Sequence, residues 1–71
     1  MEDIYKIEIW QYHSKVDEYI SNDVKEVLNW YNEEWYLMYK AGFCCFYLYK
    51  NDVKLTFDEE YKLGFGKQEE E

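Results

Sequence analysis

The sequence predicts a single α+β domain in which one N-terminal strand and one long helix precede a three-stranded antiparallel meander. Three observations lead to this fold class. Apolar residues alternate near the N-terminus, recur every three or four positions through residues 22–40, and alternate again in short runs after Gly42. A helix packed on one face of an antiparallel sheet is the simplest way to bury all three patterns.

The N-terminal strand is predicted over residues 4–12. Tyr5, Ile7 and Ile9 share one face of it, and charged residues occupy the other face. β-Branched and aromatic residues, which strands prefer, dominate the segment. The apolar residues of the next segment, 13–21, have helical spacing. We therefore expect a connection there that contains at most a turn of helix.

One long helix is predicted over residues 22–40. Ser21, Asn22 and Asp23 are three consecutive candidates to cap its N-terminus, and Gly42 occupies the position that commonly ends a helix. Between these signals the apolar residues trace a single helical face. A competing interpretation ends the helix near Asn32 and makes residues 35–39 a strand. The helical periodicity continues through that segment, which favours the single helix.

A β-hairpin is predicted from residues 43–50 and 53–57, because the two residues between them, Asn51 and Asp52, are of the turn-forming type. An acidic turn follows. Residues 61–65 then alternate between apolar and small or charged side chains, which predicts the third strand of the meander. The helix is expected to pack on one face of this sheet.

The folded domain is expected to span residues 1–66, with residues 67–71 as an acidic, disordered tail. A chain of 71 residues is long enough for one domain and too short for two. The expected core consists of the apolar positions that face the contact between helix and sheet. These positions are Tyr5, Ile7, Ile9, Val24, Val27, Leu28, Tyr31, Trp35, Phe46, Leu48, Val53, Leu55, Phe57 and Leu63.

Aromatic residues make up 23% of the chain, which is more than one small core can enclose. The alternation in residues 43–50 sends every second ring to the face of the sheet away from the helix. Exposed rings of this kind commonly anchor a partner protein or a second copy of the chain. The candidate aromatic binding face consists of Trp10, Phe43, Tyr47 and Tyr49.

The charge of the chain favours a basic protein as its partner. Sixteen acidic residues face eight basic ones, all of them lysine, and the net charge is −8. This excess argues against direct nucleic-acid binding and against binding to an anionic membrane, both of which require basic residues. A basic protein surface would instead be attracted.

No catalytic, metal-binding or cofactor-binding pattern is recognisable in the sequence. His13 is the single histidine, and the adjacent Cys44 and Cys45 have no basic cluster beside them that would activate a thiol. We therefore expect no enzymatic activity, no cofactor and no metal. The N-terminus has no signal-peptide pattern, and free adjacent thiols suit a reducing compartment, so the expected location is the cytoplasm.

Short acidic runs indicate a second candidate binding surface. Carboxylates three or four positions apart on a helix are about 5–6 Å apart, and those two positions apart on a strand are about 6.6 Å apart. A rigid array with these spacings can imitate a row of DNA phosphates and occupy a basic groove, with an affinity that falls as salt is added. The candidate carboxylate surface consists of Asp17, Glu18, Asp23, Glu33, Glu34, Asp58, Glu59 and Glu60.

With its acidic runs at residues 17–18, 33–34 and 58–60, its small size and its aromatic content, the chain resembles phage-encoded DNA-mimic inhibitors. Within that class it is similar to phage inhibitors of the host nucleoid protein HU. The resemblance implies that the chain occupies the DNA-binding surface of HU in the host cytoplasm and disturbs the organisation of the host chromosome.

Two other interpretations follow from the aromatic face. One is an inhibitor that docks through this face on another host enzyme or defence complex, such as an anti-CRISPR protein or an inhibitor of a polymerase or nuclease. The other is a homodimer that pairs through the sheet. Dimerisation is compatible with DNA mimicry, because the aromatic face can serve the dimer while the carboxylates face the partner.

Overall fold

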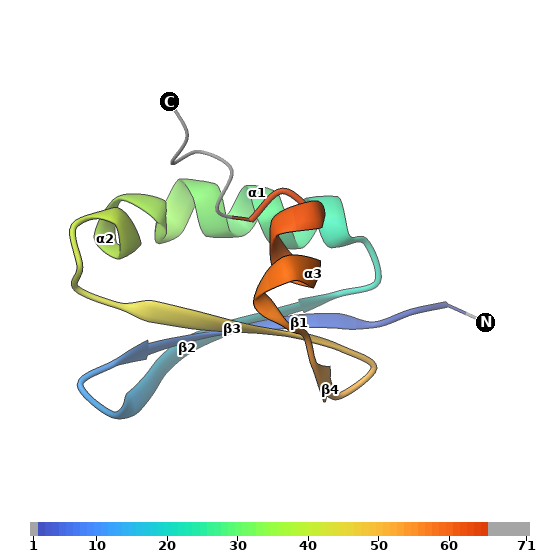
Figure 1. Cartoon of the computed structure of the whole chain (residues 1–71), viewed down its shortest axis with the longest axis horizontal. Coiled ribbons are helices and arrows are strands. Elements are labelled where there is room, and N and C mark those ends of the chain that lie inside the picture. Colours follow the sequence, from blue (N-terminus) through green and yellow to red (C-terminus); the bar gives the residue numbers. More distant parts are fainter. Residues whose placement is uncertain (1, 66–71) are drawn as a thin grey trace.

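The computed structural model describes residues 2–65, which form a four-stranded antiparallel sheet with helices packed over one of its faces (Figure 1). The strand order is β2-β1-β3-β4, so β1 and β3 are the central strands. The strands are β1 (Tyr5–Gln11), β2 (Ser14–Ser21), β3 (Cys45–Lys50) and β4 (Val53–Lys54). The helices are α1 (Val24–Glu34), α2 (Tyr36–Lys40) and α3 (Phe57–Lys62).

The predicted α+β class with an antiparallel sheet is confirmed, but two strands precede the first helix instead of one, and that helix is short. The tail predicted at residues 67–71 lies outside the described residues. Within residues 2–65, no helix is long and apolar enough to cross a membrane.

The segment predicted as a connection after β1 is the edge strand β2, which pairs with β1 along its whole length. Tyr12 and His13 join the two strands in a two-residue turn, and both have positive φ, of 50° and 72°. This conformation matches the twist of a hairpin. The register shifts between Ile9 and Trp10, so β2 contains an extra residue there. The prediction was wrong because this bulge interrupts the alternation that identifies a strand.

The single long helix predicted at residues 22–40 is divided at Trp35, whose backbone has a φ of −129°. The indole Nε1 of Trp35 donates a hydrogen bond to Oδ2 of Asp17 in β2 at 3.3 Å, so a tertiary contact accompanies the break. The Tyr39 amide donates to the Trp35 carbonyl, and helical spacing therefore resumes. The competing interpretation, which ended the helix near Asn32, came close to this break, whereas the single-helix prediction contained none. Its strand at residues 35–39 is also wrong, because these residues belong to the break and α2.

The third strand of the predicted meander is replaced by helix α3, and β4 is only two residues long. Thr56 and Glu59 form a capping box at the start of α3. The Thr56 hydroxyl accepts a hydrogen bond from the Glu59 amide at 3.2 Å, and the Glu59 carboxylate accepts one from the Thr56 amide at 2.8 Å. This pair satisfies two of the free amides at the helix start. The prediction treated the acidic run as a turn and overlooked its partner, Thr56.

Gly64 ends α3 and turns the chain back toward the core. Its φ of 106° lies in a region that L side chains rarely adopt. The amides of Gly64 and Phe65 donate to the carbonyls of Tyr61 and Glu60, which is the Schellman arrangement at a helix end. Phe65 is thereby buried, with its ring centroid 5.7 Å from that of Tyr31.

The core lies between the sheet and the helices. Its fully buried apolar side chains are Ile7, Ile9, Val27, Tyr31, Leu48 and Phe65. All except Phe65 were predicted. Most other predicted core residues pack around this group while remaining partly exposed, but two were wrong, because Val53 is 64% and Phe57 75% exposed. Phe57 was misplaced because the strand alternation does not continue into α3, and Val53 is exposed on the short edge strand β4.

Candidate partner-binding surfaces

The sheet has an open face, on the side away from the helices, that is built mainly by the two central strands (Figure 1). The register places Glu8 of β1 between Glu18 of β2 and Tyr47 of β3. Alternation along β1 then puts Lys6 and Trp10 on the same face as Glu8. The open face therefore combines aromatic rings with charges of both signs.

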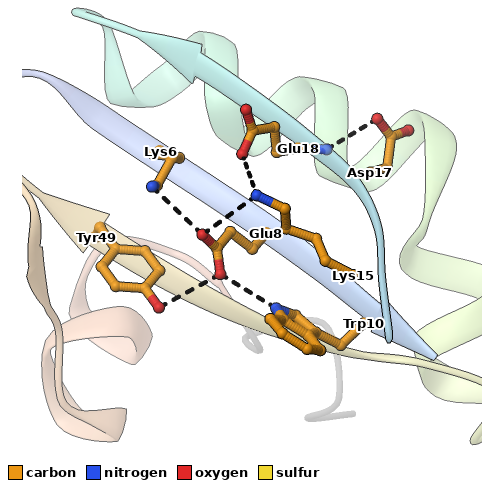
Figure 2. A network of polar contacts seen from close by, with 7 residues as sticks. All are labelled: Lys6, Glu8, Trp10, Lys15, Asp17, Glu18 and Tyr49. Carbon is orange, nitrogen blue, oxygen red and sulfur yellow. Dashed lines mark hydrogen bonds and ion pairs between the residues drawn. The ribbon is translucent and has the colours of Figure 1, made fainter. Parts of the chain in front are cut away.

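Glu8 lies at the centre of the open face and is only 8% exposed (Figure 2). Its carboxylate accepts a hydrogen bond from Trp10 Nε1 at 3.1 Å and one from the Tyr49 hydroxyl at 3.4 Å. Ion pairs join it to the Nζ atoms of Lys6 at 3.3 Å and Lys15 at 3.8 Å. Burial by itself would raise the pKa of Glu8, but the hydrogen bonds and charges of Trp10, Lys6 and Lys15 together lower it below its ordinary value. Glu8 is thus held as a carboxylate that organises the surrounding side chains.

Lysine side chains cover part of the aromatic rings on this face. The Nζ of Lys6 lies 4.9 Å from the centroid of the Tyr49 ring, and that of Lys54 lies 4.3 Å from the Tyr47 centroid. Both tyrosines are therefore half-buried. The predicted alternation in β3 is confirmed by the burial of Leu48, but the expected freely exposed aromatic patch is partly shielded.

The structure brings together three of the four residues predicted for the aromatic face. Trp10 and Tyr47 contact each other edge to face, with ring centroids 6.1 Å apart, and Tyr49 follows on the same side of β3. Phe43 is exposed, but it lies in the connection between α2 and β3, because the strand begins at Cys45.

A hollow of about 520 Å³ lies at the end of this face, between the β1–β2 turn and the first part of β3. Its lining residues are Trp10, Tyr12, His13, Cys45 and Tyr47. The sequence prediction missed Tyr12, because the β1–β2 hairpin that positions it was not recognised. Neither His13 nor Cys45 belongs to a metal-binding cluster, since residues 2–65 contain no group of three His, Cys, Asp or Glu side chains placed to hold a metal.

The predicted carboxylates of β2 and of the α1 start point in different directions or serve local structure. Asp17 is on the helix side of β2 and accepts from the Trp35 indole, whereas Glu18 is on the open face and pairs with Lys15 at 2.8 Å. Asp23 caps α1 by accepting from the Lys25 amide at 2.9 Å. These carboxylates do not form one continuous row.

The predicted carboxylates of α3 differ from one another in environment. Asp58 is exposed in the first turn. Glu59 is part of the capping box, and its hydrogen bonds with Thr56 lower its pKa. Glu60 is half-buried, and burial raises its pKa above the ordinary value, although Lys54 acts in the opposite direction. Only part of this acidic run is therefore available as a plain charged surface.

Two carboxylates on one side of α1 form an acidic stripe. We define it as Glu26, Trp30 and Glu33, which line one shallow hollow together with Tyr19 and Asn29. Trp30 stacks on Tyr19 of β2, with ring centroids 5.1 Å apart and an interplanar angle of 13°. The Glu26 carboxylate accepts a hydrogen bond from the Ser21 hydroxyl at 2.7 Å.

Glu33 was among the predicted carboxylates, and Glu26 was missed. Glu34, the neighbouring predicted residue, is exposed at the end of α1 but lies off the stripe. The seven-residue spacing of Glu26 and Glu33, close to two helical turns, was the available signal.

Comparison of the chain with models of known families, with curated proteins and with solved structures gave no match.

Proposed function

We propose that the protein is a phage-encoded DNA mimic that binds and blocks the basic DNA-binding surface of a host nucleoid protein of the HU type. The proposal rests on the acidic stripe of α1 in a chain with a net charge of −8. Under this proposal the protein acts in the host cytoplasm, and its acidic surface does not bind nucleic acid or membranes directly.

The spacing of the stripe supports this proposal. Glu26 and Glu33 lie seven residues apart on a helix, which corresponds to a rise of about 10.5 Å and nearly two full turns. The two carboxylates therefore project from the same side of α1 and place two negative charges in a row, which suits a basic DNA-binding groove.

The stripe is also held in place before a partner arrives. Ser21 fixes the Glu26 carboxylate, and the stack of Trp30 on Tyr19 ties α1 to β2. A charged array that is already ordered loses less conformational entropy on binding than a flexible one. The stripe therefore suits a basic groove better than carboxylates on a loose tail would.

The test is a competition in which the protein is titrated into a complex of an HU-type protein with labelled duplex DNA. Release of the DNA, monitored by fluorescence anisotropy, is expected, with weaker competition as salt increases. Failure to release DNA at low salt would contradict the proposal.

A pair of charge-matched variants assigns the competition to the stripe. The double variant Glu26→Gln with Glu33→Gln removes two charges from it, and Glu2→Gln with Asp52→Asn removes two charges elsewhere. The stripe variant should compete about tenfold less well than the control variant. Equal loss in both variants would show that only net charge matters.

A second candidate function is an inhibitor that docks through the open face on another host enzyme or defence complex. The specific observation in its favour is the edge-to-face pair of Trp10 and Tyr47 on that face. Under this alternative the Glu26/Glu33 double variant retains full binding to its target, whereas Trp10→Ala loses it.

We also propose that a homodimer is compatible with either function. The edge strand β2 is eight residues long and mostly exposed, and an exposed edge can pair with the same strand of a second copy. Sedimentation equilibrium distinguishes the states, because a dimer has twice the monomer mass of 8.9 kDa.

A further inference from the structure

The hollow beside the β1–β2 turn has aromatic walls. The rings of Trp10 and Tyr47 meet at 72°, so they form two adjoining sides, and Tyr12 reaches the hollow from the turn. Tyr12 is 84% exposed, so its ring is not needed to fill the core. Aromatic rings that converge in this way on an open hollow form a recognised kind of cation receptor, because their faces carry negative potential.

The tyrosine rings of this protein already attract cations. Lys6 lies over Tyr49, and Lys54 lies over Tyr47 at 4.3 Å. Lys54 lines a separate hollow on β4 and α3 that also includes Tyr47. No lysine is among the described residues that line the hollow with Trp10 and Tyr12. In that hollow, therefore, Trp10 and Tyr12 are the rings that no described lysine covers, whereas Lys54 already lies over Tyr47.

The positive φ of Tyr12 indicates that the turn itself does not favour a tyrosine at this position. Tyr12 and His13 both have positive φ, which is unfavourable for bulky residues. The other two-residue turn has almost the same φ values, 52° and 69°, but uses Asn51 and Asp52, which tolerate this conformation well. A tyrosine at such a position costs stability in the turn and gains no burial in return.

We infer that this hollow receives an arginine side chain of the basic partner. The inference deepens the proposed function and rests on it, because a basic partner supplies the arginine. The chain carries a net charge of −8, which draws a basic surface toward it. A guanidinium group is planar and weakly hydrated, so it can stack on the Trp10 indole while Tyr12 and Tyr47 flank it.

Glu8 assists this arrangement by orienting the Trp10 ring. Its carboxylate accepts the hydrogen bond from the indole Nε1 at 3.1 Å, which fixes the edge of a ring that lines the hollow. Arginine recognition thus uses an aromatic group that is already ordered by the open-face network.

The test uses a hexa-arginine peptide, a hexalysine peptide and an uncharged hexaglutamine peptide as probes of the ¹⁵N-labelled protein. The indole Nε1–H signal of Trp10 is expected to shift with hexa-arginine, to shift less with hexalysine and to stay unchanged with hexaglutamine. Hexa-arginine that shifts only signals of the α1 stripe would overturn the inference.

Tyr12→Asn is the matching variant, because asparagine suits the turn and removes the third ring. It should fold at least as well as the parent and bind hexa-arginine about two- to fivefold more weakly, with hexalysine binding changed less. Unchanged affinity for hexa-arginine in Tyr12→Asn would also overturn the inference.

The same variants separate this inference from the proposed function. If Tyr12→Asn competes with DNA for the HU-type protein as well as the parent does, the arginine receptor is wrong while the DNA-mimic function stands. If the parent fails to displace DNA but the Trp10 signal still responds selectively to hexa-arginine, the receptor is supported and the HU-type target is wrong.

Discussion

The indole of Trp10 donates a hydrogen bond to the carboxylate of Glu8 across 3.1 Å, on the face of the sheet away from the helices (Figure 2). This contact joins the aromatic part of the open face to its charged part. Glu8 is nearly buried although, among the described residues, no helices cover this face of the sheet. The side chains around Glu8 cover its carboxylate in their place.

Glu8→Ala is expected to destabilise the fold by about 1–2 kcal/mol, because it leaves two lysines and the Trp10 indole without their shared acceptor. Urea unfolding measures this change. Glu18→Ala is the control: it lies opposite Glu8 but is exposed and, among residues 2–65, pairs with Lys15 alone, so its cost should stay below about 0.5 kcal/mol. Equal costs would show that the network around Glu8 adds nothing.

The acid sensitivity of the fold should depend on Glu8 and Glu60 with opposite signs. The pKa of Glu8 is lowered in the folded protein, so the folded state binds fewer protons than the unfolded chain, and the stability from Glu8 is lost as the pH falls below 4.5. The pKa of Glu60 is raised, mainly by burial, so its contribution is present at low pH and lost as the pH rises above 4.5.

Urea midpoints at about pH 3 and about pH 7 test this assignment. Glu8→Gln should lower stability at the higher pH and reduce the loss on acidification. Glu60→Gln should raise stability at the higher pH. An identical pH dependence for the two variants would contradict the opposite signs.

Relieving the β1–β2 turn should stabilise the protein. Replacing Tyr12 and His13 by Asn and Gly supplies residues that favour positive φ at both positions. The expected gain is about 1 kcal/mol, or a rise of about 4–8 °C in the midpoint of thermal unfolding for a domain of this size. The other turn already has Asn51 at its first position, so Asp52→Gly there should give a smaller gain, and calorimetry compares the two turns directly. A loss of stability at the β1–β2 turn would mean that its side chains support the fold.

Two phenylalanines distinguish the observed core from the core expected from sequence. Phe65→Ala should cost about 3–5 kcal/mol, because Phe65 is buried against Tyr31. Phe57→Ala should cost little, because that side chain is 75% exposed. Circular dichroism during urea unfolding reports both. A larger cost for Phe57 than for Phe65 would contradict the position of α3.

Local patterns were sufficient where one segment carries its own signal. The alternation of Ile7 and Ile9 identified β1, the cap candidates at residues 21–23 marked the start of α1, and Gly42 marked the end of α2. Each of these features involves residues that are neighbours in the chain, so their physical cause is visible in the sequence.

The candidate surfaces were only partly foreseeable, because some of their residues are brought together by contacts between distant segments. Trp10, Tyr47 and Tyr49 could be assigned to one face by alternation within their own strands. The roles of Tyr12 and Glu26 could not, because they depend on the β1–β2 turn and on contacts of α1 with β2. Asp17 and Glu18 looked like one acidic run, yet strand geometry places them on opposite faces.

The sequence by itself determined the α+β class, the excess of negative charge and most of the buried side chains. Tertiary structure decided that β2 is a strand, that the helix breaks at Trp35 and that Phe65 fills the core. In the first two cases the deciding partner is far along the chain: β2 pairs with β1, and Trp35 bonds to Asp17. Phe65 is buried because α3 and Gly64 direct it against Tyr31, and this contact depends on a helix end in a segment for which the sequence predicted a strand.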